Sequence, residues 1–175
     1  IETTNASCGL GYVKTTMTGA NLNTFTVNKT APGTSWGSVY AQFTQRTTDI
    51  TDASMGLSVK RELIYDGELK VGSKVKVRIT ITADRDYDFV QVVDKRAACM
   101  EPIDQISGYM RGYYYSPRDN ATYYYTDMMR KGTHVIEATY YIDRPGTFTT
   151  GTCTVQCAYS PAYMARAKSQ TLMIK

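Results

Sequence analysis

The sequence has little of what catalytic sites are made from. Its single histidine, His134, stands behind a turn at residues 131–133 and begins an apolar, strand-like segment. This position suits the edge of a strand and offers no Ser-His-Asp or Cys-His arrangement. The chain also lacks Gly-x-Ser-x-Gly, His-Glu-x-x-His and the glycine loops that bind phosphate. We therefore expect no catalytic residues and no enzymatic activity.

Metal-binding patterns are equally scarce. The four cysteines form no Cys-x-x-Cys pair, and none lies within three positions of His134: Cys8, Cys99, Cys153 and Cys157. The acidic residues 84–88 lack the glycine and the closing glutamate of a calcium loop, and Arg85 among them would oppose a cation. This segment predicts a charged loop end with internal ion pairs. Neither a metal nor a cofactor is expected.

The cysteine spacing also limits disulfide and thioester chemistry. Cys153 and Cys157 lie in a strand-like segment, where a rise of about 3.3 Å per residue separates them by about 13 Å, beyond the reach of a disulfide. Buried thiols are expected, although one bridge between distant cysteines stays open. A thioester is excluded at Cys99, because Pro102 stands where a Cys-x-Glu-Gln motif needs glutamine.

Long apolar runs and clusters of one charge are absent as well. No run approaches the roughly 20 residues of a membrane-spanning helix, so direct membrane insertion is not expected. The first residues lack the features of a secretory signal, and a start at Ile1 favours a fragment of a longer chain over a processed one. The net charge of +4 is scattered along the sequence, which argues against nucleic acid as a partner.

The sequence does contain strand-forming residues in abundance, including 15 tyrosines among its 175 residues. Segments rich in Val, Ile, Thr and Tyr alternate with glycine and proline turns about every ten residues. In residues 74–83, apolar side chains alternate with charged or polar ones, which indicates one buried face. The predicted strands are residues 23–28, 36–43, 74–83, 89–93, 112–115, 122–125, 134–142 and 147–159. The expected fold is all-β, an antiparallel β-sandwich.

Two segments fit this pattern poorly. Residues 44–54 are polar and have no period, so we interpret them as a linker with a domain boundary near residue 52. The predicted domains are then residues 1–52 and residues 53–175. Residues 97–109 have little alternation and predict a long loop with room for one helical turn.

Two runs of tyrosine flank a turn-forming segment at residues 116–121. They predict a hairpin whose tyrosines stack across its strands on both faces. Such a surface either packs on a neighbouring domain or binds a glycan or a protein. The candidate interface residues are Tyr113, Tyr115, Tyr123 and Tyr125.

From residue 57 onwards, the chain resembles the C-terminal macroglobulin-like domain of bacterial α2-macroglobulins, especially the Bacteroides-type forms. Local patterns at residues 57–63, 69–75, 82–94, 132–148 and 157–161 carry the resemblance. Residues 32–43 resemble strands of the CUB-like domain that follows the thioester domain in this family. The resemblance implies a few CUB-like strands in residues 1–52 and a seven-stranded, immunoglobulin-like macroglobulin sandwich in residues 53–175.

The resemblance also implies a function. In this family a large protein in the periplasm or cell envelope, often lipid-anchored, inhibits proteases. Cleavage by the protease exposes a thioester that traps it. The expected partners are the upstream thioester and macroglobulin-like domains of the same polypeptide, and target proteases through the full-length protein. This chain would be the non-catalytic domain that packs on the thioester domain and shields it.

The family's Met-Tyr-x-Pro turn is the part thought to approach the thioester. It maps onto residues 158–161, where Tyr159 matches and Ala158 replaces the methionine. The resemblance therefore implies Tyr159, Ala158 and the nearby Met164 as shielding candidates. The alternative role for Tyr159 is to anchor the end of its own strand. The alternative function is a stand-alone cell-surface adhesive or glycan-binding sandwich that uses its tyrosines.

Overall fold

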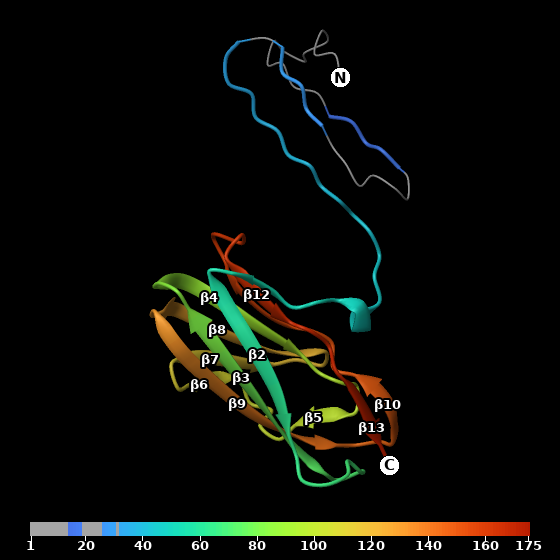
Figure 1. Ribbon diagram of the computed structural model, residues 1–175. Helices are drawn as coiled ribbons and strands as arrows, with labels where there is room; N and C mark the ends of the chain where they lie inside the picture. The colour runs from blue at the N-terminus through green and yellow to red at the C-terminus, as the bar shows by residue number, and fades with distance from the viewer. Residues whose placement is uncertain (1–13, 19–25, 31) are drawn as a thin grey trace. The chain divides into compact units, whose positions relative to one another are not determined.

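The computed structural model describes residues 14–18, 26–30 and 32–175 (Figure 1). Internal contacts divide the chain into two units, Ile1–Gln42 and Phe43–Lys175. Residues 43–52, which we expected in the first domain, therefore belong to the second unit. Two hydrogen bonds tie the last two residues of this segment to the C-terminal part of the chain: Arg166 Nε donates to the Thr51 carbonyl at 3.1 Å, and the Lys168 amide donates to Asp52 Oδ1 at 2.7 Å. The CUB-like identity of residues 1–52 stays a prediction.

The described part of the first unit has no helix and no strand, and its side chains are exposed. Trp36, for example, is 93% exposed. The strand predicted for residues 36–43 is therefore wrong. A strand needs a hydrogen-bonding neighbour, and no other described segment pairs with this one. Residues 23–25 of the other predicted strand, and Cys8, lie outside the described residues.

The second unit is built from antiparallel strands, with one 3-10 turn, η2 (Thr47–Asp49), before them. Among the described residues no helix is long enough to cross a membrane. The strands are β1 (Ala53–Met55), β2 (Leu57–Ile64), β3 (Lys74–Ala83), β4 (Tyr87–Lys95), β5 (Met100–Pro102), β6 (Gly108–Met110), β7 (Tyr113–Pro117), β8 (Ala121–Met129), β9 (Gly132–Ile142), β10 (Gly146–Thr149), β11 (Cys153–Cys157), β12 (Met164–Ala167) and β13 (Thr171–Ile174).

Eleven of these strands form one continuous sheet in the order β5-β9-β3-β2-β1-β12-β11-β4-β8-β7-β6, and β10 pairs with β13 separately. Strands that are distant in this order meet through buried side chains, which shows that the sheet folds over on itself. Thr122 Oγ1 on β8 lies 2.8 Å from the Tyr140 hydroxyl on β9, and both residues are fully buried. The predicted all-β antiparallel sandwich is confirmed. It has more strands than the seven expected, since short strands such as β1, β5 and β6 extend it.

The core follows the alternation predicted for residues 74–83. Val75, Val77, Ile79 and Ile81 are buried, while the charged and polar side chains between them are exposed or half-buried. Burying each such aliphatic side chain contributes roughly 1.5–3 kcal/mol. The period-2 pattern of this strand therefore sets which face of the sheet turns inward.

A buried ion pair crosses this apolar core. Arg61 on β2 donates to Asp94 Oδ1 on β4 at 3.0 Å, and both side chains are at most 2% exposed. The same guanidinium donates to the Thr150 hydroxyl and to the carbonyls of Lys95, Gly151 and Lys168. Burial raises the pKa of Asp94, and the charge of Arg61 opposes that shift. The pair thus joins β2 to β4, and the Arg61 guanidinium also ties in the segment before β11 and the residue after β12.

Two other expectations need correction. The predicted loop at residues 97–109 contains β5 and β6 and no helical turn. The predicted strand at residues 147–159 is broken into β10 and β11 at residues 150–152 and ends at Cys157, because Gly151 has a left-handed backbone with φ +70° and the chain changes sheets there. Among the described residues, Cys99, Cys153 and Cys157 are buried free thiols, as expected.

Candidate functional site

The turn between β11 and β12, residues 158–163, carries the sequence that we aligned with the family's Met-Tyr-x-Pro motif. Hydrogen bonds fix both of its ends. The Cys157 amide donates to the Tyr163 carbonyl at 3.1 Å, and the Tyr163 amide donates to the Ser160 carbonyl at 3.0 Å. Gln156 Nε2 on β11 donates to the Pro161 carbonyl at 3.0 Å. The turn is therefore closed and braced by its own strand.

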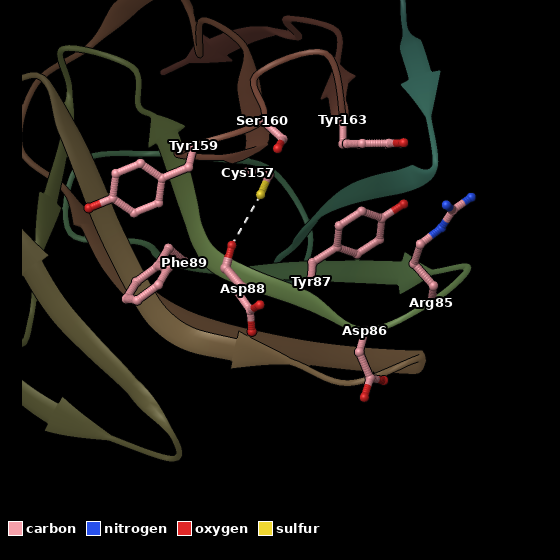
Figure 2. Close-up of a pocket in the computed structure, with 9 residues that line it drawn as sticks. All are labelled: Arg85, Asp86, Tyr87, Asp88, Phe89, Cys157, Tyr159, Ser160 and Tyr163. Carbon is pink, nitrogen blue, oxygen red and sulfur yellow. Dashed lines mark hydrogen bonds between the residues drawn. The ribbon is translucent and has the colours of Figure 1, made fainter.

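Tyr159 lies in this turn and is 81% exposed. Its ring meets Phe89 of β4 edge to face, with the ring centroids 5.2 Å apart and the planes at 90° (Figure 2). Two further contacts join the same strand to the start of the turn: the Ala158 amide donates to the Phe89 carbonyl at 2.8 Å, and the Cys157 thiol donates to the Asp88 carbonyl at 3.1 Å. Tyr159 is thus exposed to solvent, although its ring and the adjacent backbone are held against β4.

A second aromatic pair supports the other end of the turn. Tyr163 packs against Tyr87 with ring centroids 5.4 Å apart, and the Arg85 guanidinium lies 5.5 Å from the Tyr163 ring centroid. The Tyr87 hydroxyl donates to Asp84 Oδ1 at 2.6 Å, and Arg85 forms an ion pair with Asp84 at 3.0 Å. This ion pair confirms the charged loop end predicted for residues 84–88.

The two aromatic pairs border an open cavity of about 390 Å³ (Figure 2). Arg85 and Asp86 lie at its polar end, and Phe89 and Tyr159 lie at its aromatic end. Arg85 holds the pKa of Asp84 down to about 2, with help from the Tyr87 hydroxyl. Within the described part of the chain, no group of three His, Cys, Asp or Glu side chains is placed to hold a metal. The site presents aromatic surface and no nucleophile-base pair.

The other two shielding candidates, Ala158 and Met164, do not present a ring to solvent as Tyr159 does. Ala158 is exposed at the start of the turn and contributes its amide to Phe89. Met164 is half-buried at the start of β12, where it pairs with Gln156 and with Met55. Tyr87, Phe89 and Tyr163 were not predicted from the sequence as supporting residues. The aromatic pattern of residues 87–89 was visible, but nothing in the sequence showed that it packs on the β11–β12 turn.

The tyrosine hairpin forms as predicted from β7 and β8, but its side chains divide between two environments. Tyr113 and Tyr115 are 9% and 3% exposed and belong to the core, which corrects the expectation that they form an interface. The strand alternation turns them inward, where Tyr115 packs on Tyr124. Tyr123 and Tyr125 stack on the outer face with centroids 6.3 Å apart. Their role at a domain interface stays a prediction.

The Tyr87 hydroxyl gives this site an expected alkaline pH dependence. Burial, and then the hydrogen bond to Asp84, raise the pKa of Tyr87 to about 12 from an ordinary value near 10. The folded state favours the neutral phenol of Tyr87. The stabilisation that this phenol contributes is therefore complete below pH 10 and is lost as the pH rises towards 12. We expect Tyr87→Phe to lose roughly 1 kcal/mol at pH 8 and to lose less additional stability than the wild type between pH 8 and pH 11.

The measurement is urea denaturation at pH 8 and pH 11. Tyr109→Phe is the control, because it removes the hydroxyl of a tyrosine that is 83% exposed. A Tyr87→Phe variant that loses as much stability as the wild type over this pH interval would contradict the assignment.

Comparison with known proteins identifies the family of this chain. The family model described as "Bacterial Alpha-2-macroglobulin MG10 domain" matches residues 39–162. The structure of Salmonella α2-macroglobulin reacted with methylamine matches with a TM-score of 0.64 and 22% identity, over 72% of this chain and 10% of that one. No curated protein sequence matches the chain significantly.

Two Escherichia coli structures have the same fold. Trypsin-activated α2-macroglobulin matches with a TM-score of 0.64 and 17% identity, over 72% of this chain and 11% of that one. The native protein from domain MG7 to the C-terminus matches with a TM-score of 0.64 and 16% identity, over 73% of this chain and 25% of that one. The chain thus spans between 10% and 25% of the length of these three structures. The resemblance inferred from the sequence is confirmed, and the chain belongs to the bacterial α2-macroglobulin MG10 domain family.

Proposed function

We propose that this chain is a non-catalytic domain of a bacterial α2-macroglobulin-type protease inhibitor, in which it packs on the thioester domain and Tyr159 shields the thioester. The observation that carries the proposal is an exposed tyrosine in a turn that is braced at both ends. An exposed aromatic ring usually gains from burial. A ring that stays 81% exposed while its backbone is fixed is prepared to enter a partner's surface.

Tyrosine suits this shielding role chemically. Its flat ring excludes water from a reactive bond, and its hydroxyl can donate a hydrogen bond to a carbonyl. The aromatic end of the cavity, formed by Phe89 and Tyr159, would continue the apolar cover. The expected partners are the thioester domain and other macroglobulin domains of the same polypeptide, because the similar solved structures are multidomain proteins of which this domain spans a small part. Target proteases would be met only through the full-length protein.

The test uses the intact polypeptide that contains this domain. We expect Tyr159→Gly to react with methylamine on the order of tenfold faster than the wild type, since loss of about 1.4 kcal/mol of protection corresponds to a factor of ten in rate. The measurement is the appearance of free thiol over time, after addition of methylamine to the resting protein.

The matched control is Tyr109→Gly, because Tyr109 is 83% exposed but lies on β6, outside the β11–β12 turn. Its rate should equal that of the wild type. Equal rates for Tyr159→Gly and the wild type would reject the shielding role. A complete reading frame without a Cys-x-Glu-Gln motif would reject the thioester as the shielded group.

A further inference from the structure

We propose that Phe89 is a positioning residue for Tyr159, and that its unusual backbone conformation is what places its ring beneath the tyrosine. The inference rests on the proposed function, since the orientation of Tyr159 matters only if the ring acts on a partner. Among the described residues, only Phe89 and Arg111 have a positive φ without being glycine, at 52° and 51°. Arg111 lies in the tight turn between β6 and β7, where such values are common.

Phe89, in contrast, lies inside β4. A bulky aromatic residue in the left-handed region is a rare outlier, and such conformations persist only where the surroundings hold them. Those surroundings are Cys157, the last residue of β11, and Ala158, the first residue of the β11–β12 turn. The Phe89 carbonyl accepts the Ala158 amide at 2.8 Å, and the preceding carbonyl, of Asp88, accepts the Cys157 thiol at 3.1 Å.

The left-handed residue shifts the alternation of β4. From Val90 onwards, every second side chain is buried, which would leave Tyr87 and Phe89 together on the outer face. Instead Tyr87 is 5% exposed and Phe89 is 48% exposed. The strand can therefore send Tyr87 inward to support Tyr163 and Phe89 outward to support Tyr159 (Figure 2). A regular strand could not direct both rings in this way.

The contact between the two rings gives Phe89 control over Tyr159. Edge-to-face packing at 5.2 Å and 90° fixes the direction of the tyrosine ring. Tyr159 has little other support, because most of its surface is exposed. Removing the Phe89 ring should leave the turn in place, since the hydrogen bonds between the turn and β4 involve the backbone carbonyls of residues 88 and 89. The loss of the ring should, however, free the Tyr159 side chain.

The first test measures this freedom directly in the 175-residue chain by NMR. Phe89→Gly removes the ring and is the substitution that best tolerates a positive φ, whereas Phe89→Tyr keeps an aromatic ring. We expect NOEs between rings 89 and 159 in the wild type and in Phe89→Tyr. In Phe89→Gly we expect the Tyr159 ring resonances to move to those of an unrestrained tyrosine. Amide shifts on β3 and β9 should stay unchanged in all variants. Unchanged Tyr159 ring resonances in Phe89→Gly would overturn the proposal.

The second test separates this inference from the proposed function. In the intact inhibitor, Phe89→Gly should speed the reaction with methylamine by a smaller factor than Tyr159→Gly, and Phe89→Tyr should restore the wild-type rate. In a Tyr159→Gly background, Phe89→Gly should add nothing, because it acts through the tyrosine. A purely structural role for Phe89 would instead add to the effect of Tyr159→Gly.

The outcomes are distinct. If Tyr159→Gly speeds the reaction and Phe89→Gly does not, the positioning role is wrong and the proposed function stands. If neither substitution changes the rate, the proposed function is wrong. The NMR result then still decides whether Phe89 orients Tyr159.

Discussion

Asp94→Ala is expected to destabilise the second unit by about 3–5 kcal/mol, because it leaves the Arg61 guanidinium buried without its counter-ion. The side chains of Arg61 and Asp94 are 1% and 2% exposed, so water cannot replace the lost carboxylate. Arginine also cannot lose its charge by giving up a proton. The four other acceptors of Arg61 are neutral and compensate only in part.

The measurement is the free energy of unfolding from urea or guanidinium denaturation. The matched control is Glu62→Ala on the same strand, which also removes the acidic partner of an ion pair. In that pair the side chains of Lys60 and Glu62 are 71% and 39% exposed. That exposed pair should contribute at most about 1 kcal/mol. The double substitution Arg61→Met with Asp94→Leu should recover much of the loss, since it removes both charges together. A loss below about 1 kcal/mol in Asp94→Ala would show that the pair is not a structural link between the layers.

The buried ion pair also shows how far the sequence could predict the fold. Leu57, Val59 and Leu63 set the inward phase of β2, and Arg61 shares it. Asp94 likewise shares the inward phase of Val90 and Val92 on β4. Two opposite charges on inward positions of two strands indicate a buried ion pair. The burial of Arg61 and Asp94 could therefore have been predicted from the alternation of each strand. What local patterns could not give is which strands face each other, because that depends on how the whole sheet folds over.

The strands themselves were predictable where one face is buried. Residues 74–83 match β3 because their alternation reflects the core directly. Residues 36–43 have the same strand-like composition, but a strand also needs a neighbour, and composition says nothing about whether one is present. The inward placement of Tyr113 and Tyr115 was missed for a related reason. Consecutive tyrosines hide the alternation that separates core from surface.

The candidate site was predictable only in part. The resemblance pointed to Tyr159, and the structure shows that its ring is exposed on a braced turn. Two of the supporting residues, Tyr87 and Phe89, lie about 70 positions earlier in the chain, and Phe89 has a left-handed backbone. A bulky residue in that conformation is favoured only by its tertiary contacts. No local pattern would therefore have indicated it.

Gly56 offers the second large effect, because it lies directly behind the aromatic pair that supports the turn. It joins β1 to β2 with φ +70°, and its carbonyl accepts the Asp84 amide at 3.1 Å. A Cβ at this position would collide with the Tyr87 hydroxyl and lie 2.9 Å from Tyr163 Cδ1. We expect Gly56→Ala to cost about 2–4 kcal/mol, from the left-handed backbone together with overpacking.

The chain offers a control that separates these two causes. Gly67 has φ +63° and no atom within 4 Å of an added Cβ, so Gly67→Ala should cost only about 1 kcal/mol, the backbone part of the effect. The excess in Gly56→Ala measures the collision, and Tyr87→Phe should relieve some of it by removing the hydroxyl. Denaturation of Gly56→Ala, Gly67→Ala, Tyr87→Phe and the double variant Gly56→Ala with Tyr87→Phe gives these differences. Equal costs at Gly56 and Gly67 would mean that Tyr87 and Tyr163 yield easily. A clear excess at Gly56 would show that the Tyr87–Tyr163 pair, which packs at one end of the β11–β12 turn, is rigidly placed.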